Sequence, residues 1–238
     1  MRRVIQALEG IRTHVPFDVA RQAVAKPSGV AAMRAPAHLD EAYELARGGG
    51  NLANCLHALR ESDDGAWPEV TARIREGLGA NLVDIKMPAV GVGSFALAFY
   101  YADLPDPIPA SALSDGQLAF IAFVVLTRLA RRNSLLVFDE PEMHLHPELL
   151  VRLVWLFEEL AGYCPVVLCT QSDGLLDALT DPAASTVLCE LDEKHATQVL
   201  RPDAQRLREW LRDYRGLGAL RAEGYARQVL TVSSQDGR

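Results

Sequence analysis

The sequence predicts an α/β protein with a largely parallel sheet flanked by helices. Three short apolar segments, SLLVF (134–138), PVVLCT (165–170) and STVLCEL (185–191), alternate with stretches of helical periodicity. Short continuous apolar runs are typical of strands buried in a parallel sheet, and helices between them indicate crossover connections. Polar residues follow the first two runs directly, at the strand ends where open α/β sheets place their functional sites.

Length and composition indicate an ordinary globular protein. Of 238 residues, 49% are hydrophobic and 23% are charged, which is enough for one ample domain or two small ones. The formal net charge of −7 excludes a polycation that coats nucleic acid without specificity. The longest apolar run, 118–126, is too short to span a bilayer, and the N-terminus has no apolar core of the signal-peptide type. With four scattered cysteines and no CxxC pair, we expect free thiols in a cytoplasmic protein.

The first half of the chain predicts helices and a hairpin. Residues 1–50 are weakly patterned, with prolines that interrupt any long helix. Apolar residues at helical spacing predict a helix over 51–60, and a second amphipathic helix is expected over 67–78, with Pro68 in its first turn. Residues 84–105 alternate apolar and small side chains around two glycines, which predicts a β-hairpin.

The second half is more regular. A helix capped by Ser114 or Asp115 is expected to reach about Arg132, and it is apolar on nearly every face, so it should be buried on several sides. Further helices are expected over 147–160 and 174–179, and residues 197–200 can pair with the strand 185–191 across the turn DEKHA. Residues 203–230 are helical in pattern and rich in arginine.

The first motif with chemical potential is LSDGQ, at the start of the buried helix. A hydroxyl, a glycine and free backbone N–H groups at a helix N-terminus can bind a phosphate-like anion. The residues concerned are Ser114, Asp115, Gly116 and Gln117. Taken alone the motif is weak, because any capped helix after a loop looks similar.

The second motif is LLVFDEPE, at the end of the first apolar strand. Asp139 is placed to hold Mg²⁺, which prefers carboxylate oxygen, and Glu140 is placed to orient or deprotonate an attacking water. The third motif is CTQS at the end of the next strand, where Gln171 could hydrogen-bond a γ-phosphate or its water. The simpler alternative for each is a strand that ends in a solvated polar turn.

Taken in order, the three motifs resemble the ABC-type ATPases, and more narrowly the RecF- and SMC-like AAA-type ATPases of bacteria. LSDGQ is similar to the family signature, LLVFDEPE to its Walker B strand with the catalytic glutamate, and residues 143–147 to its D-loop. CTQSDGLLDAL is similar to the switch segment, although glutamine stands where ABC transporters usually carry histidine. The resemblance is dense over about 110–190 and looser elsewhere.

The resemblance implies a P-loop NTPase fold with ATP and Mg²⁺ as ligands. It implies a homodimer in which Ser114 and Gly116 contact the γ-phosphate of nucleotide held by the other subunit. Asp139, Glu140 and Gln171 would serve the nucleotide of their own subunit. It further implies a partner moved by the ATP-driven closure, either DNA or an effector such as a nuclease, and no membrane.

One part of the family pattern is missing. The Gly-rich P-loop, GxxxxGK[ST], is absent, and none of the three lysines (Lys26, Lys86 and Lys194) follows a glycine. We therefore expect a C-terminal portion of such an ATPase without its front lobe, whether through truncation, a misassigned start codon or natural loss. The expected regions are a helical and hairpin lid (1–112), the ATPase-like core (113–200) and C-terminal helices (201–238). Apolar surface is expected to be exposed where the front lobe would pack.

Three alternatives stay open. The chain could be a non-catalytic scaffold that keeps the fold for assembly. His144 and His146, with neighbouring glutamates, could belong to a metal-dependent hydrolase, although a zinc site needs three or four converging ligands. The arginines of the final helices could contact DNA or a partner, although a solvated face paired with acids is the default.

Overall fold

The computed structural model describes residues 2–20, 32–62, 65–192, 194–201 and 203–213. These residues form two compact units, Met1–Thr170 and Gln171–Arg238, which are described separately. The boundary lies between Thr170 and Gln171, within the predicted switch segment CTQSDGLLDAL. The predicted three-region division stays a prediction.

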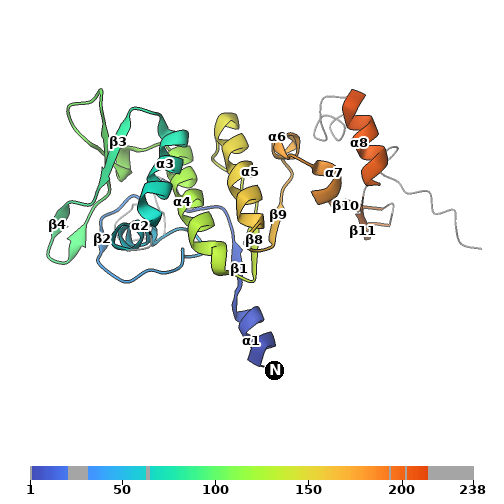
Figure 1. Ribbon diagram of the computed structural model, residues 1–238, viewed down its shortest axis with the longest axis horizontal. Coiled ribbons are helices and arrows are strands. Elements are labelled where there is room, and N and C mark those ends of the chain that lie inside the picture. The colour runs from blue at the N-terminus through green and yellow to red at the C-terminus, as the bar shows by residue number, and fades with distance from the viewer. Residues whose placement is uncertain (1, 21–31, 63–64, 193, 202, 214–238) are drawn as a thin grey trace, which may run out of the picture. The chain divides into compact units, whose positions relative to one another are not determined.

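The first unit contains most of the regular structure (Figure 1). Its helices are α1 (Arg2–Glu9), α2 (Leu52–Glu61), α3 (Ala66–Leu78), α4 (Asp115–Leu129) and α5 (Pro147–Ala161), with the 3₁₀ turns η1 (Ala110–Ala112) and η2 (Ala130–Arg132). Its strands are β1 (Ile11–His14), β2 (Ala37–His38), β3 (Leu82–Lys86), β4 (Ala89–Gly91), β5 (Ser94–Phe95), β6 (Ala98–Tyr101), β7 (Ile108–Pro109), β8 (Leu135–Asp139) and β9 (Val166–Cys169).

The central sheet of the first unit is parallel, in the order β1-β8-β9. Leu136 lies opposite Arg12 on one side and Val166 on the other, so β8 is the middle strand. The α/β class with a parallel sheet, predicted from the alternating apolar runs, is therefore confirmed. The contribution of β1 was not predicted, because its sequence IRTH carries too few apolar residues to stand out.

An aromatic cluster fixes helices to one face of this sheet. Phe138 of β8 contacts Phe123 of α4, with ring centroids 4.9 Å apart, and Phe157 of α5 at 6.4 Å. Phe17 completes the cluster at 5.2 Å from Phe138. Because a strand residue points to one face only, α4 and α5 cover the same face.

Helix α4 is the core of the unit, as its sequence predicts. Every residue from Leu118 to Thr127 is buried, and the helix packs against α2, α3 and α5. The helices predicted at 51–60 and 67–78 are also confirmed. Leu52, Cys55, Leu56 and Leu59, whose spacing predicted the first of them, are all buried.

The predicted hairpin is part of a larger pair of small sheets. Strands β4 and β5 form the hairpin itself, around a turn at Gly93, where φ is +65°. The flanking strands β3 and β6 pair with each other, and β2 and β7 add at the edges.

The second unit holds α6 (Asp173–Ala178), α7 (Pro182–Ser185), β10 (Leu188–Leu191), β11 (Thr197–Leu200) and α8 (Ala204–Asp213). The antiparallel pairing of β10 with β11, predicted across DEKHA, is confirmed. Among the described strands, β10 pairs with β11 alone and does not extend the parallel sheet, which corrects its assignment as a third strand of that kind. The Asp192 carboxylate accepts the backbone N–H groups of Lys194 and Ala196, and these bonds lower its pKa. The predicted helical pattern beyond residue 213 lies outside the described residues.

Candidate functional site

The signature-like segment forms the N-terminus of α4. Ser114 is the N-cap, with its Oγ 3.2 Å from the backbone nitrogen of Gln117, which donates to it. The backbone N–H of Ser114 in turn donates to Oε1 of Gln117 at 3.0 Å, which completes a capping box. The hydroxyl hydrogen of Ser114 is not used by the cap, since the hydroxyl accepts there, so it can still be offered to an anion.

Asp115 is held by a buried arginine. Its carboxylate pairs with the guanidinium of Arg34, whose side chain is 1% exposed. The same guanidinium donates to the carbonyl oxygens of Leu113 at 2.7 Å and Ser111 at 3.2 Å, and to that of Val19 at 2.7 Å. Arg34 thus fixes the loop that enters α4 and offsets the negative charge of Asp115, which would otherwise repel an anion at this helix end. Nothing in the sequence signals Arg34, because most of its acceptors are backbone groups far along the chain.

Gly116 brings α4 against the loop that follows β8. A Cβ atom added at Gly116 would lie 2.8 Å from the carbonyl oxygen of His144 and 3.9 Å from the backbone nitrogen of His146. The signature-like and D-loop-like segments therefore touch within one chain. The contact explains why glycine stands at this position.

The acidic pair lies at the carboxyl end of the central strand. Asp139 is exposed and lies opposite Cys169 of β9 in the parallel register. The backbone N–H of Glu140 donates to the Cys169 carbonyl oxygen at 2.8 Å, which continues the ladder past the strand. Glu140 has φ +48° and His144 has φ +70°, and such conformations are costly for residues other than glycine and concentrate at functional sites.

Glu142 connects this loop to the end of β9, a contact that no sequence pattern signals. Its Oε1 accepts a hydrogen bond from the Thr170 hydroxyl at 2.6 Å. Its Oε2 is buried and has no hydrogen-bond partner. Thr170 is the last residue of the first unit, and Gln171 is the first residue of the second. The hydrogen bond to Glu142 therefore holds the end of the first unit in place.

His14 is buried beside the same strand. It ends β1, its ring stacks on Phe138 with centroids 5.8 Å apart, and its Nδ1 lies 3.3 Å from the Arg47 carbonyl oxygen. Burial lowers the pKa of His14, and the charges of Arg12 and Arg47 lower it further. The neutral imidazole is therefore part of the core.

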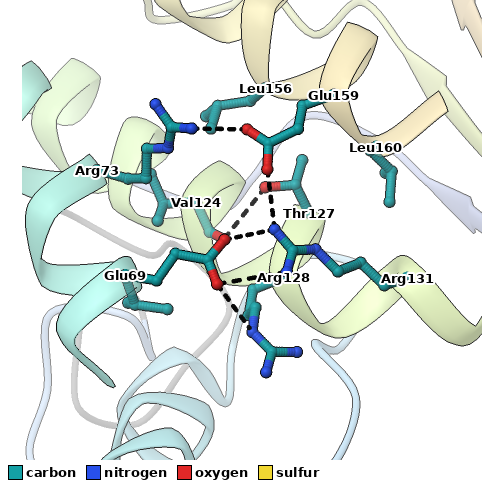
Figure 2. A pocket seen from close by; sticks show the side chains of 10 residues that line it. Glu69, Arg73, Val124, Thr127, Arg128, Arg131, Leu156, Glu159 and Leu160 are labelled. Atoms are coloured by element: carbon teal, nitrogen blue, oxygen red, sulfur yellow. Dashed lines mark hydrogen bonds and ion pairs between the residues drawn. The ribbon is translucent and has the colours of Figure 1, made fainter. Parts of the chain in front are cut away.

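A small cavity between α3, α4 and α5 is a structural site (Figure 2). Its volume of about 20 Å³ is that of roughly one water molecule, and no predicted site residue lines it. Glu69 pairs there with Arg128 and Arg131, and Glu159 pairs with Arg131 at 2.9 Å and Arg73 at 2.8 Å. The network joins three helices through two carboxylates and three guanidinium groups, and the excess positive charge is offset by the ion pair of Arg73 with Glu76 at 3.3 Å.

The described residues hold no group of three or more His, Cys, Asp or Glu side chains arranged to bind a metal ion. His146 of the D-loop-like segment caps α5, with its Nδ1 3.5 Å from the backbone nitrogen of Glu148. In the described part of the chain, no helix is long and apolar enough to cross a membrane.

Comparisons with solved structures find heads of SMC ATPases. One comes from work on ATP-driven dimerization and DNA-stimulated activation of SMC ATPases (15% identity, TM-score 0.45, 62% of this chain and 89% of that one). Another is the Smc head with coiled coil and joint from Pyrococcus yayanosii (15%, 0.42, 60% and 28%). A third is the Pyrococcus furiosus Smc head bound to the C-terminal domain of ScpA (14%, 0.45, 61% and 36%). The chain thus spans well under half of the two Pyrococcus chains.

No curated protein matches the sequence. A family profile described as "AAA domain, putative AbiEii toxin, Type IV TA system" matches residues 9–177, which is more than half of the chain and includes all the motifs above. The chain belongs to this family of AAA-type ATPase domains.

Proposed function

We propose that this chain is the signature- and Walker-B-bearing part of an ABC-type ATPase that works at a dimer interface. The observation that carries the proposal is the approach of Gly116 to the His144 carbonyl, next to the acids that end the central strand. This contact fixes a helix N-terminus suited to an anion against the loop that follows carboxylates suited to Mg²⁺ and water, so that one subunit can offer the two groups to two different nucleotides. ATP and Mg²⁺ are accordingly the proposed ligands.

The proposed roles follow the chemistry of each group. Asp139 holds Mg²⁺ through an exposed carboxylate, and Glu140 orients or deprotonates the attacking water. Gln171 hydrogen-bonds the γ-phosphate or its water.

The helix end acts on the second subunit's nucleotide. Ser114 donates its hydroxyl hydrogen to a phosphate oxygen there, while Gly116 and Gln117 supply N–H groups near it. Asp115 contributes indirectly, because its ion pair with Arg34 keeps the helix end receptive to an anion. Closure of the dimer then acts on DNA or on an effector protein such as a nuclease.

The residues present do not provide the cradle for the nucleotide. No glycine precedes any of the three lysines, so the backbone nest and the phosphate-binding lysine of a P-loop are absent from the 238 residues. We therefore expect no ATP turnover from this chain alone. Turnover requires a P-loop supplied by another segment.

The first test is the ATPase rate of the purified chain with Mg²⁺. We expect the rate of ATP hydrolysis to equal that of buffer without protein, both for the unaltered chain and for Glu140→Gln. A Mg²⁺-dependent rate in the unaltered chain that Glu140→Gln abolishes would show that the nucleotide is held in some other way.

The second test is to examine the coding region upstream. If it encodes a strand, GxxxxGK[ST] and a helix, the extended protein should hydrolyse ATP, and Glu140→Gln should reduce the rate at least 100-fold while leaving ATP bound. If no such motif exists, the scaffold function replaces the ATPase. The lysine positions are the specific observation that favours this second candidate.

A further inference from the structure

The tip of the β4–β5 hairpin is an apolar surface that is exposed to solvent. Val92 at the turn is fully exposed, Val90 in β4 is 53% exposed, and Leu39, the residue that follows β2, is 58% exposed. Leu39 lies beside the turn, because its backbone N–H donates to the carbonyl oxygen of Gly93 at 2.9 Å. Single exposed apolar residues are common on protein surfaces, but a group of them indicates a site of interaction. We call Leu39, Val90 and Val92 the hairpin tip.

The edge of β4 is open beside the hairpin tip. In the sheet β2-β5-β4, all residues of β4 (Ala89–Gly91) are exposed, and among the described strands β4 pairs with β5 alone. The other small sheet, β3-β6-β7, has a protected edge, since Arg75 of α3 donates to the carbonyl oxygens of Leu82 at 2.8 Å and Val83 at 2.7 Å in β3. Strand β4 holds no charged residue that would discourage pairing, and an unprotected edge can accept a further strand.

The chain around the hairpin tip is acidic. Residues 35–46 and 87–127 contain no lysine or arginine. Asp40 and Glu41 follow Leu39 directly, and both are exposed. Neither carboxylate forms an ion pair within the part of the chain that the structure describes. An acidic and apolar surface repels the phosphate groups of DNA and attracts lysine and arginine side chains.

The cations that flank these two segments are engaged elsewhere. Lys86 pairs with Asp84 at 3.8 Å in the other small sheet. Arg34 is buried at the start of α4, and the backbone of Arg47 contacts His14 at the end of β1. The negative charge beside the hairpin tip is therefore available to a binding partner.

We propose that the hairpin tip binds an extended segment of a partner protein that carries apolar side chains together with lysine or arginine. The segment adds as a strand to β4, its apolar side chains contact Val90 and Val92, and its cations pair with Asp40 and Glu41. Figure 1 shows β4 on the side of the first unit that is remote from the parallel sheet, so the contact leaves the end of that sheet free. The inference rests on the proposed function only in its choice of partner: of DNA and an effector protein, this surface fits the protein.

The first test measures the binding of labelled peptides to the full chain by fluorescence anisotropy. One peptide alternates lysine with valine, and the other alternates glutamate with valine. We expect only the lysine peptide to bind, and we expect added NaCl to weaken its binding because the paired charges are exposed. A fully N-methylated copy of the lysine peptide, which cannot donate hydrogen bonds to a strand, should not bind. Equal anisotropy changes for the lysine and glutamate peptides, or undiminished binding of the N-methylated copy, would overturn the proposal.

Matched variants locate the contact on the surface. Asp40→Lys should weaken binding of the lysine peptide at least about tenfold, because a repulsion replaces an attraction. Asp106→Lys, the same exchange at an exposed acid between β6 and β7, should leave binding unchanged. Val92→Ser should also weaken binding, whereas Leu104→Ser, at an apolar residue that is 43% exposed elsewhere, should not. All four positions are exposed, so each variant should fold, which far-UV circular dichroism checks. Equal effects within either pair would show that the peptide binds at another surface.

Photo-cross-linking identifies the natural partner. The full chain with benzoylphenylalanine in place of Val92 is irradiated in the cells that encode it, and the joined segment is sequenced. We expect a protein segment with apolar residues and an excess of lysine and arginine over acids, and we expect Asp40→Lys to abolish this product. A product with DNA, with a second copy of the chain or with an acidic segment contradicts the proposal, and so does the lack of any product.

The docking tests are independent of ATP hydrolysis. A failed ATPase test leaves the peptide and cross-linking results unchanged. Failure of the peptide to bind leaves the proposed ATPase function standing and removes only the docking site.

Discussion

At the scale of single residues, Arg34 shows how a buried charge can shape a site without belonging to it. Its guanidinium has backbone carbonyls and the Asp115 carboxylate as partners, so almost all of its hydrogen-bonding capacity is used. A buried charge is tolerated only with such partners, and removing one member leaves the others desolvated and unpaired.

Replacement of this arginine should therefore be costly. We expect Arg34→Met to lower the free energy of unfolding by about 3–5 kcal/mol in urea titrations, because the Asp115 carboxylate and the carbonyls lose their donor. Arg73→Met is the control, since Arg73 forms exposed ion pairs whose loss costs about 1 kcal/mol or less. Similar losses in the two variants would contradict the role assigned to Arg34.

His14 makes stability depend on pH. The pKa of His14 in the folded state is lowered below the unfolded value of about 6.5, and burial is the largest cause of this shift. As pH falls, the unfolded chain therefore binds more protons than the folded chain does. The contribution of His14 to the free energy of unfolding is complete above about pH 6.5 and is lost as pH falls through the folded-state pKa. We expect His14→Phe to flatten the decline in unfolding free energy between pH 7 and 5.

An exposed histidine is the control for the buried His14. His38, which lies 3.0 Å from the Ser94 hydroxyl on the surface, can be changed to Gln. The slope of stability against pH should stay as in the unaltered protein for His38→Gln. An equally steep slope in His14→Phe would mean that other groups cause the decline.

At the scale of elements, the site depends on how closely α4 approaches the loop after β8. The obstacle to a side chain at Gly116 is the His144 backbone carbonyl, which cannot rotate away as a flexible side chain can. That loop is restrained from several directions, by the ladder bond of Glu140, the Glu142–Thr170 bond and the cap of α5.

Gly116→Ala should separate these elements. Alanine favours a helix by about 1 kcal/mol over glycine, but we expect a net loss of about 1–2 kcal/mol because the added methyl group overpacks the contact. Gly48→Ala, at a position with nothing within 4 Å, should change stability by less than 1 kcal/mol. A stabilised Gly116→Ala protein would show that the loop yields easily.

At the scale of the whole molecule, the division after Thr170 places Asp139 and Glu140 in one unit and the predicted switch residue Gln171 in the other. The first unit contains the parallel sheet, the aromatic cluster and α4. A chain ending at Thr170 should therefore fold, with a cooperative urea transition and the near-UV signal of its packed aromatic side chains. A non-cooperative transition would show that the second unit is needed for the core.

The helices and the acid-ended strand could be predicted from the sequence because their signals are local. Apolar spacing located α2, α3, α4 and α5 nearly to the residue, and the run before Asp139 located β8. Strand β1 could not be predicted, since Ile11 is its single apolar residue and its buried residue is His14. That apolar surface is exposed where a front lobe would pack stays a prediction.

The sequence by itself determined the α/β class, the order of the motifs and the lack of a GxxxxGK[ST] motif in these 238 residues, because these are properties of neighbouring residues along the chain. Only the tertiary structure decided what surrounds the motifs: Arg34 on Asp115, His144 against Gly116, and Thr170 on Glu142. Each of these contacts joins residues separated by 28 or more positions, or depends on a backbone carbonyl that every residue has. No local sequence pattern identifies residues that meet in this way, because only folding brings them together.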